Sequence, residues 1–581
     1  MSDPQLVLAA RVQAALTAAF GPEYADTDPV IRPSQFADFQ ANVALPLAKR
    51  LGRKPRDVAN ELVAGLDVTD VCARIEVSGP GFVNLTLSDE WIERQALVMH
   101  GDERLAVPAA DEPQKVVVEY SSPNVAKEMH VGHLRTTIVG DAIARILEFL
   151  GHSVVRDNHL GDWGTPFGML IEHLLDVGED SADARLLETH PNAFYQAARV
   201  KFDTDPAFAE RARERVVRLQ GGDPDTLRHW HKLVDLSKEY LHRVYGRLGV
   251  SLTDEDIRGE SFYNDLLATT AAELEDKGVA VISDGALCVF PPGFTGREGE
   301  PLPVIIRKRD GGYNYSTTDL ATIRHRVDEL KVDRVVYVVG AAQALHFQMA
   351  FAVARMAGWV PEDVRLEHAQ IGNVLGTDGK ILRTRAGGTI KLSALLDEAV
   401  ERAGQEFEKI EHDEPFDEET RREIIETIGI GAVKYADLSV ALDSEYIFDF
   451  DRMVPFKGNT GPYLQYATAR IRSIFRKGGV DPQDASGPIL TGTAAERALA
   501  LRLLGFGAAV QLAGETAEPH RLCTYIFELA SAFTTFYEAC PVIKEGVEPE
   551  VRASRLALCS LTLNTLVRAL DLLGVGTPQR M

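Results

Sequence analysis

The chain of 581 residues is predicted to be a multidomain α/β protein, in which a parallel-sheet domain lies between a small α+β N-terminal domain and an all-α C-terminal domain. At ~150 residues per domain, this length favours about four domains. In the middle of the chain, short apolar runs alternate with helical patterns, which is typical of a parallel α/β sheet. Beyond about residue 395, nearly every segment has helical periodicity.

Residues 1–110 form the predicted N-terminal domain. Apolar residues at helical spacing run from Leu6 to Phe20, and alternating apolar residues between Ile75 and Leu85 predict strands. Residues 102–114 mix charge, alanine and proline without periodicity, so we expect a linker there.

Residues 111–395 form the predicted parallel-sheet domain. Its first buried strand is the apolar run Lys115–Tyr120, and apolar residues at helical spacing then predict a helix that begins near His130 and stops at Gly151. Two later apolar runs predict further strands of the same sheet: Val304–Arg307 and Arg334–Val339. Charged helical patterns predict an inserted helical segment at about 170–250.

The last third of the chain is predicted to be helical throughout. We expect residues 396–455 to form a helical connection and residues 456–581 an all-α domain, with a loop at 478–493. From residue 451 onward the chain has 14 Lys and Arg against 12 Asp and Glu, although the whole chain has a net charge of −24. The net charge excludes a uniformly basic nucleic-acid coat but not a local basic surface near the C-terminal end.

The five cysteines and the apolar runs indicate the cellular compartment of the protein. The cysteines are far apart and form no Cys-x-x-Cys pair, which argues against zinc binding and against a disulfide framework. The chain shows no export signal and no run of the ~18 apolar residues that a membrane span requires. We therefore expect a cytoplasmic protein without a membrane partner.

The segment Ser121–Arg135, between the first strand and the first helix of the sheet domain, has the residues that indicate chemistry. His130 and His133 are three residues apart on the first helical turn, and Gly132 between them leaves room for close approach. The unpaired N–H groups of a helix start attract anions. Two imidazoles donating to phosphate oxygens would stabilise charge during displacement at the α-phosphate of a nucleoside triphosphate.

A His-x-x-His pair also fits half of a metal site, or two histidines making surface hydrogen bonds. No cluster of His, Cys and carboxylates nearby in sequence offers a third ligand, and the pair follows a first strand, where open sheets bind nucleotides. A rival phosphate loop at 372–381 has the wrong spacing and lacks the Ser or Thr of a P-loop. The sequence therefore favours a nucleotide site without a bound metal.

The stretch 119–141, which includes Lys127-Glu-Met-His-Val-Gly-His133, resembles the signature of arginyl-tRNA synthetases, whose class I relatives have His-Ile-Gly-His at this place. Further blocks of the chain look like the family's later motifs and follow in the same order: 161–168, 378–389, 429–438 and 458–467. The likeness covers nearly the whole chain. The Lys-Met-Ser-Lys-Ser loop of most class I synthetases is absent, as it commonly is in arginyl enzymes.

The resemblance implies an arginine–tRNA ligase with a Rossmann-like catalytic domain. Such an enzyme forms arginyl-adenylate from L-arginine and ATP with Mg²⁺ and no zinc, and then transfers arginine to the 3′ end of tRNA(Arg). It implies a monomer that needs bound tRNA before it activates arginine. It also implies an N-terminal domain that contacts the outer corner of the tRNA, and an anticodon-binding C-terminal domain.

The same resemblance assigns roles to individual residues. Lys127 would act with His130 and His133 in catalysis, in place of the missing loop cation. The other implied ATP-binding residues are Gly132, Lys380 and Arg383, and mobile glycines such as Gly387 would let the second loop close over pyrophosphate. The implied arginine pocket consists of Glu119, Asp319 and Tyr315 around the guanidinium and Asn124 and Gln343 at the α-amino group.

Basic groups and exposed aromatics on the C-terminal helices suit phosphates and unpaired bases. The candidates for tRNA binding are Tyr463, Tyr466, Arg470 and Arg472. Phe533 and Phe536, which lie at helical spacing, are instead expected in the core.

Two other functions fit parts of this sequence. A catalytically silent paralogue that binds RNA would have lost Lys127 or the histidines, and all three are present. A small-molecule nucleotidyltransferase shares the His-x-Gly-His device but is normally one compact α/β domain. The N-terminal domain and the helical C-terminal third therefore favour the ligase.

Overall fold

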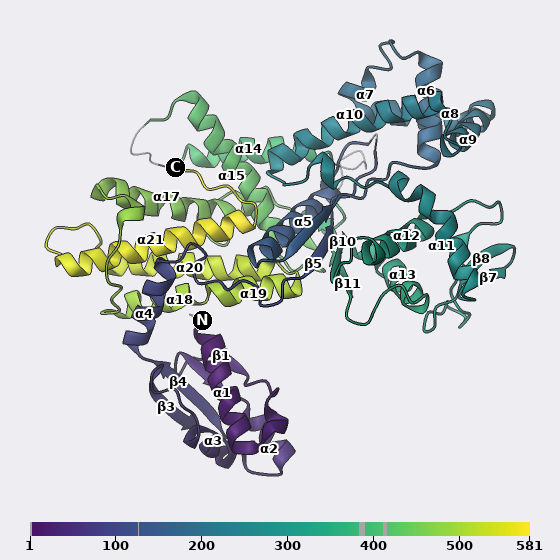
Figure 1. Cartoon of the computed structure of the whole chain (residues 1–581). Helices are drawn as coiled ribbons and strands as arrows, with labels where there is room; N and C mark the ends of the chain where they lie inside the picture. The colour runs from purple at the N-terminus through teal and green to yellow at the C-terminus, as the bar shows by residue number, and fades with distance from the viewer. Residues whose placement is uncertain (1–2, 126, 383–389, 411–414) are drawn as a thin grey trace.

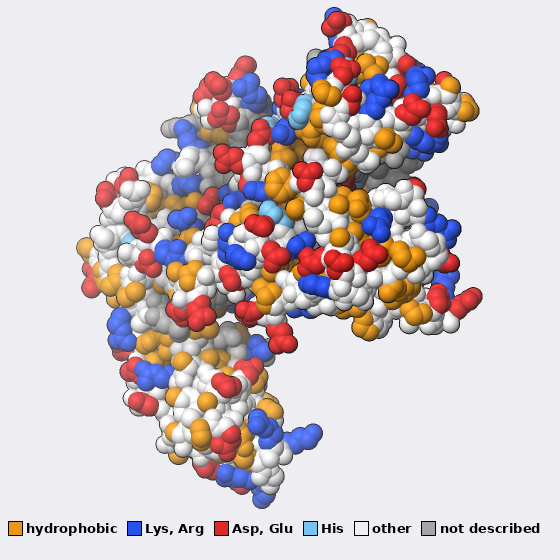
Figure 2. Space-filling view, turned by 45° about the vertical axis from the view of Figure 1, so that its right-hand side comes forward, with side chains coloured by type: hydrophobic (Ala, Val, Ile, Leu, Met, Phe, Trp, Pro, Cys, Tyr) orange, Lys and Arg blue, Asp and Glu red, His pale blue; other side chains and the backbone are white. Residues whose placement is uncertain are grey.

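The computed structural model describes residues 3–125, 127–382, 390–410 and 415–581. The N-terminal domain lies at one end of the molecule, the helical C-terminal domain joins it to the central sheet, and the inserted helices project at the far side (Figure 1). On the face in Figure 2, acidic and basic side chains are interspersed, as expected for a chain without a uniformly basic coat.

The N-terminal domain is a four-stranded antiparallel sheet covered by helices, with strand order β1-β2-β4-β3. The predicted first helix is α1 (Pro4–Phe20), which buries Leu8, Val12 and Leu16, and the predicted strands are β3 and β4. The remaining elements are β1 (Ile31–Pro33), β2 (Phe39–Ala41), α2 (Ala44–Leu51), α3 (Pro55–Ala64), β3 (Cys72–Ser78), β4 (Phe82–Leu87) and α4 (Asp89–His100). As predicted, residues 102–114 form neither helix nor strand.

A four-stranded parallel sheet forms the centre of the molecule, with strand order β11-β10-β5-β6. Its strands are β5 (Lys115–Glu119), β6 (Ser153–Asp157), β10 (Arg334–Gly340) and β11 (Arg365–Ile371). Because all the pairings are parallel, the turns that follow the four strands leave the same edge of the sheet. The predicted parallel α/β sheet and its two runs at 115 and 334 are therefore confirmed.

The prediction for Val304–Arg307 was wrong in one respect. The run forms a strand, β9, but β9 pairs antiparallel with β8 (Ala286–Val289), which pairs with β7 (Val281–Ser283) in a separate sheet. Ile305 is 38% exposed while Val304 and Ile306 are buried, so the strand has one solvent-facing side. Three apolar residues in a row do not distinguish such a strand from one buried on both faces.

Helices cover both faces of the parallel sheet. Val116 and Val118 of β5 pack with α5 (Val131–Phe149), whereas Val117 packs on the other face with α12 (Tyr315–Asp328) and α13 (Ala344–Met356). Helix α5 starts at Val131, as predicted. It lies so close to the end of β5 that a Cβ at Gly140 would be 2.1 Å from the Cβ of Tyr120, so this position requires glycine.

The predicted insertion is helical, and it projects from the sheet domain (Figure 1). Its helices are α6 (Thr165–Val177), α7 (Leu186–Thr189), α8 (Pro191–Thr204), α9 (Pro206–Gln220) and α10 (Pro224–Leu248). The chain returns to the sheet domain through short 3-10 turns, of which Glu260–Tyr263 is one, and through α11 (Asn264–Asp276).

The C-terminal third is helical, as predicted, apart from the strand β13 (Tyr446–Ile447), which pairs with β12 (Val374–Leu375). Its helices are α14 (Leu392–Phe407), α15 (Glu418–Leu438), α16 (Phe450–Met453), α17 (Gly461–Gly478), α18 (Ala494–Leu504), α19 (Phe506–Thr516), α20 (His520–Ala539) and α21 (Pro549–Leu572). Phe533 and Phe536 are buried in it, as expected.

One helical stretch of the described residues, Ala494–Thr516, meets the length and composition of a membrane span, with a mean hydropathy of 1.2. From the sequence we predict no run of apolar residues long enough to span a membrane. Half of the stretch is buried within the molecule, and Gly505 divides it into α18 and α19, which pack against α20. Buried core helices can have the same length and apolar composition as a membrane span.

Candidate active site

The turn after β5 places the signature segment at the carboxyl edge of the sheet. Ser121 and Ser122 both have left-handed backbone, with φ of 68° and 46°, which costs a residue with a Cβ about 1 kcal/mol or more. Buried hydrogen bonds hold this turn: Ser121 Oγ lies 2.7 Å from the Tyr245 hydroxyl, and Thr137 Oγ1 donates to Ser121 Oγ at 2.9 Å. The turn is thus tied to α10 and to α5.

The two imidazoles cap the first turn of α5. Nδ1 of His130 accepts from the Gly132 N–H at 3.1 Å, and Nδ1 of His133 accepts from the His130 N–H at 3.1 Å. The ring centroids are 3.9 Å apart. Because each Nδ1 accepts a backbone N–H, the proton of each neutral ring is on Nε2. Each ring therefore offers one Nε2–H donor to an anion.

Both histidines are held neutral near pH 7. Burial, with smaller contributions from His130 and Lys127, lowers the pKa of His133 to about 3. Burial also lowers the pKa of His130, with a contribution from Lys127. The site therefore combines two neutral imidazole donors with the ammonium of Lys127.

The second loop, residues 376–391 between β12 and α14, is joined to this turn by backbone pairing. The Val131 N–H donates to the Ile390 carbonyl at 3.1 Å, and the Leu392 N–H donates to the Met129 carbonyl at 3.0 Å. On the other side of the loop, Lys380 is exposed beside a tight turn at Gly379, which has a φ of +72°. Arg383 and Gly387 lie outside the described residues.

The predicted guanidinium pocket is built on the start of α12. The Asp319 carboxylate pairs with Nε2 of His346 at 2.5 Å, and the ring of Tyr315 lies 5.1 Å from the His346 ring. Tyr315 is 63% exposed, so this end of the pocket is open. Asp319 therefore faces a protein imidazole in this structure.

Glu119 already has a guanidinium partner from the protein itself. Nη2 of Arg326 lies 2.6 Å from Glu119 and 2.9 Å from Asp157, and all three side chains are buried. Burial raises the pKa of Glu119, and the charge of Arg326 opposes that rise. The structure thus places Glu119 in a buried ion network with Arg326 and Asp157, and Arg326 belongs to α12, the helix that also contains Asp319.

Glu260, which the sequence does not single out, is a partly buried carboxylate close enough to Asp319 for the two charges to interact. Burial raises the pKa of Glu260 to about 7, the charge of His159 opposes the rise, and the charges of Asp162 and Asp319 add to it. Glu260 lies in the 3-10 turn that follows the insertion. In the sequence, Glu260 belongs to no motif, so no local signal distinguishes it from other acidic residues.

Asn124 and Gln343 follow β5 and β10, so both leave the same edge of the sheet, and both are exposed. Asn124 pairs with Gly161, where a Cβ would lie 2.3 Å from the Asn124 Oδ1. The glycine therefore makes room for this amide. Among the residues that the structure describes, no group of three or more His, Cys, Asp and Glu side chains is arranged to hold a metal ion.

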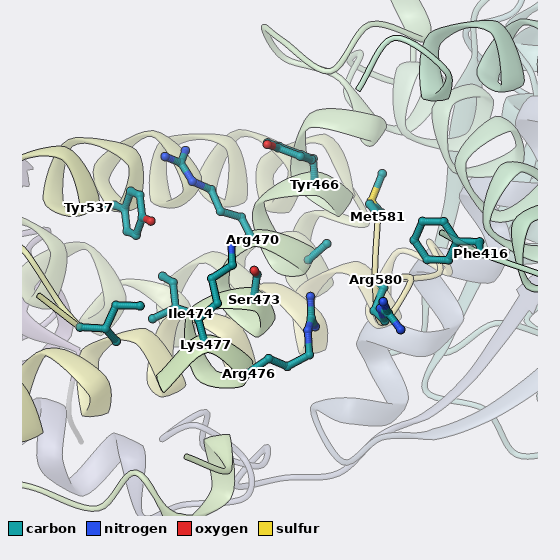
Figure 3. Close-up of a pocket in the computed structure, with 12 residues that line it drawn as sticks. Phe416, Tyr466, Arg470, Ser473, Ile474, Arg476, Lys477, Tyr537, Arg580 and Met581 are labelled. Carbon is teal, nitrogen blue, oxygen red and sulfur yellow. The ribbon is translucent and has the colours of Figure 1, made fainter. Parts of the chain in front are cut away.

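The C-terminal helices form a basic hollow of about 590 Å³ (Figure 3). Tyr466 and Arg470 of α17 line it, and the Arg470 guanidinium lies 4.2 Å from the ring centroid of Tyr537. The other cations that line the hollow are Arg476, Lys477 and Arg580. Cations beside two tyrosine rings suit a phosphate and an unpaired base.

The other two candidates on α17 have structural contacts. Arg472 donates to the Pro578 carbonyl at 2.7 Å and contacts Thr577 Oγ1 at 3.3 Å, so its guanidinium holds the C-terminal segment. Tyr463 is half-buried, with its hydroxyl 3.3 Å from Thr534 Oγ1. Tyr466 and Arg470 are therefore the better placed pair for RNA.

Comparisons with known proteins agree with this arrangement. Three family models match successive parts of the chain: the arginyl tRNA synthetase N terminal domain at residues 6–87, the catalytic domain of class I (R) tRNA synthetases at 94–450, and the DALR anticodon binding domain at 464–581. The catalytic model alone covers more than half of the chain.

Relatives and solved structures match over the full length. The arginine–tRNA ligase of Thermobifida fusca is 65% identical and that of Cellvibrio japonicus 48% identical, with 100% and 98% of each chain covered. The arginyl-tRNA synthetase structures of Plasmodium falciparum and Thermus thermophilus match with TM-scores of 0.83 and 0.84, at 28% and 26% identity, over 99% and 100% of each chain.

Proposed function

The chain belongs to the arginyl-tRNA synthetase family of class I and is an arginine–tRNA ligase. We propose that its residues carry out the reaction in two steps. In the first step, L-arginine and ATP give arginyl-adenylate and pyrophosphate. In the second, arginine passes to the 3′ end of tRNA(Arg) and AMP is released.

ATP binds across the start of α5. The Nε2–H groups of His130 and His133 donate to phosphate oxygens while the arginine carboxylate attacks the α-phosphate, and Gly132 between them leaves room for the nucleotide. The Lys127 ammonium stabilises the negative charge that builds as the bond to pyrophosphate breaks. Neutral imidazoles suit this work because they donate without the desolvation cost of two further buried cations.

Arginine is selected by carboxylates around a planar cation. Asp319 and Glu260 accept hydrogen bonds from the substrate guanidinium, Tyr315 covers it, and Glu119 lies in the buried network beneath. Asn124 and Gln343, at the edge of the sheet, hold the α-amino group. Lysine would leave carboxylate acceptors unpaired, and such mismatches discriminate by ~10⁴ or more without an editing site.

The second step brings the 3′ end of the tRNA to the adenylate, where the 2′-hydroxyl of the terminal adenosine accepts arginine. At the other end, the basic hollow of α17 takes an unpaired anticodon base between its tyrosines. Support comes from the cations that line it and from the match to an anticodon binding domain. Arginine activation requires bound tRNA, as the resemblance to the family implies.

The remaining assignments concern the setting of the reaction. Mg²⁺ enters as the ATP complex, since Mg²⁺ in such sites is commonly held by substrate phosphates with few protein ligands. Lys380 and Arg383 of the second loop contact the leaving pyrophosphate. The enzyme works as a cytoplasmic monomer without a membrane partner.

The observation that carries this mechanism is the turn at the carboxyl end of β5 that contains His130 and His133, here called the imidazole turn, beside the carboxylates of the pocket. Exchange of labelled pyrophosphate into ATP tests it, with arginine and with or without tRNA(Arg). We expect strong exchange only when tRNA is present. Equal exchange without tRNA would contradict the tRNA requirement, and no exchange under either condition would contradict the proposed first step.

A further inference from the structure

The three residues before the imidazole turn are held by the inserted helices. The Glu128 N–H donates to Oδ1 of Asn192 at 3.1 Å, and Nδ2 of Asn192 donates to the Glu128 carboxylate at 2.7 Å. The Met129 N–H donates to the Tyr240 hydroxyl at 3.0 Å. Asn192 lies on α8 and Tyr240 on α10, so two helices of the insertion form hydrogen bonds with one short segment of the active site.

Glu128 also joins this segment to the second loop. Its carboxylate pairs with the Lys391 ammonium at 2.9 Å, and Lys391 pairs along the backbone with His130. A single carboxylate thus contacts an amide from the insertion on one side and an ammonium from the second loop on the other. The backbone of the catalytic segment is therefore fixed from both sides.

Lys127 is held through its side chain. Its ammonium nitrogen lies 4.6 Å from the centroid of the Tyr195 ring, which belongs to α8, one turn beyond Asn192. The ammonium is also close enough to both imidazoles to contribute to their low pKa values, after burial. One aromatic ring therefore holds the cation while it lies beside the two histidines.

We propose that helix α8 of the insertion is part of the active site, and that Tyr195 is a positioning residue that keeps the Lys127 ammonium aimed at the ATP phosphates. This inference rests on the role of Lys127 in the proposed function. A lysine side chain has many rotamers, and the negative face of an aromatic ring restricts the ammonium to one position. Preorganised charge of this kind acts on the transition state more than on substrate binding.

The test is a single-turnover measurement of arginyl-adenylate formation with tRNA(Arg) and MgATP. We expect Tyr195→Leu to lower the rate about tenfold, because the cation loses the ring face. Tyr195→Phe keeps the ring, so its rate stays within about twofold of the unchanged enzyme. The KM for arginine should not change in either variant.

A double-mutant cycle separates positioning from a general structural effect. Lys127→Met alone should be slow, and adding Tyr195→Leu to it should change the rate by less than about twofold, because the ring then has no cation to hold. Gln196→Ala, an exposed neighbour on the same helix, is the control and should match the unchanged enzyme. Melting temperatures of all variants report folding.

Either of two results would overturn the inference: a further full loss from Tyr195→Leu in the Lys127→Met background, or a loss in Tyr195→Phe as large as that in Tyr195→Leu. The rate of Lys127→Met alone tests the proposed function itself. If Lys127→Met forms adenylate at the normal rate, the lysine assignment of the proposed function is wrong, and the inference is overturned together with it.

Discussion

The imidazole turn and helix α17 use their polar side chains in different ways. In the turn, each predicted imidazole uses one nitrogen to accept a backbone N–H and keeps the other as a donor. On α17, the predicted side chains divide. Arg472 holds the C-terminal segment, whereas Arg470 and Tyr466 line the basic hollow.

The difference shows what fixed spacing specifies. The capping bonds of His130 and His133 join residues two and three positions apart, so the partners that orient the rings are local in the sequence. Basic and aromatic residues along a helix have no such constraint, and the tertiary partners decide which of them remain available for RNA.

The largest effect is expected at His133. Replacing it with alanine removes an Nε2–H donor whose hydrogen bond matters most in the transition state, so kcat for adenylate formation should fall by about 10² or more. His242→Ala, an exposed imidazole on α10, is the matched control. A rate for His133→Ala equal to that of the control would remove His133 from the catalytic residues.

The second effect is on arginine binding. Asp319→Asn removes the charge that faces the guanidinium, and the KM for arginine should rise between about tenfold and a hundredfold, with a smaller change in kcat. Asp328→Asn, on the exposed end of the same helix, should leave the KM unchanged. Unchanged arginine binding in Asp319→Asn would mean that the pocket lies elsewhere.

The third effect depends on pH. With a pKa of about 7, Glu260 is half-protonated near neutrality in the free enzyme, and only its carboxylate binds a guanidinium. The kcat/KM for arginine should therefore rise with pH, about tenfold per unit below 7, and level off above it. In Glu260→Gln this rise should disappear. A profile with the same midpoint in that variant would assign the titration to another group.

The smallest effect separates two arginines of α17. Arg470→Ala should weaken tRNA binding several-fold and lower the slope of log Kd against log salt by about one, as expected for a lost phosphate contact. Arg472→Ala should leave that slope unchanged and instead lower the free energy of unfolding by about 1–3 kcal/mol, because the Pro578 carbonyl and the Thr577 hydroxyl lose their donor. Equal salt slopes for both variants would contradict the division seen on this helix.

Local sequence predicted much of the catalytic end. The apolar run at 115–120 and the helical spacing after His130 predicted β5 and α5, because hydrophobic periodicity is a local property. The parallel sheet followed from the alternation of such elements. The prediction for 304–307 names the wrong sheet because three apolar residues followed by an arginine fit either kind of strand.

The missed features are contacts between distant residues. Arg326 and Glu119 are 207 positions apart, so no local pattern indicates that the protein supplies its own guanidinium to this carboxylate. Asn192 is 64 positions from Glu128, inside an insertion whose helices look like ordinary charged surface helices in the sequence. Only the fold brings these residues to the catalytic segment.

The most direct test of the mechanism is aminoacylation of total bacterial tRNA by the purified chain, with MgATP and each of the twenty amino acids in turn. We predict charging with arginine, and with lysine at a rate lower by about 10⁴ or more, because the carboxylates of Asp319 and Glu260 require a fork-shaped cation. No charging with arginine, or charging with lysine within about a hundredfold of arginine, would contradict the proposed pocket.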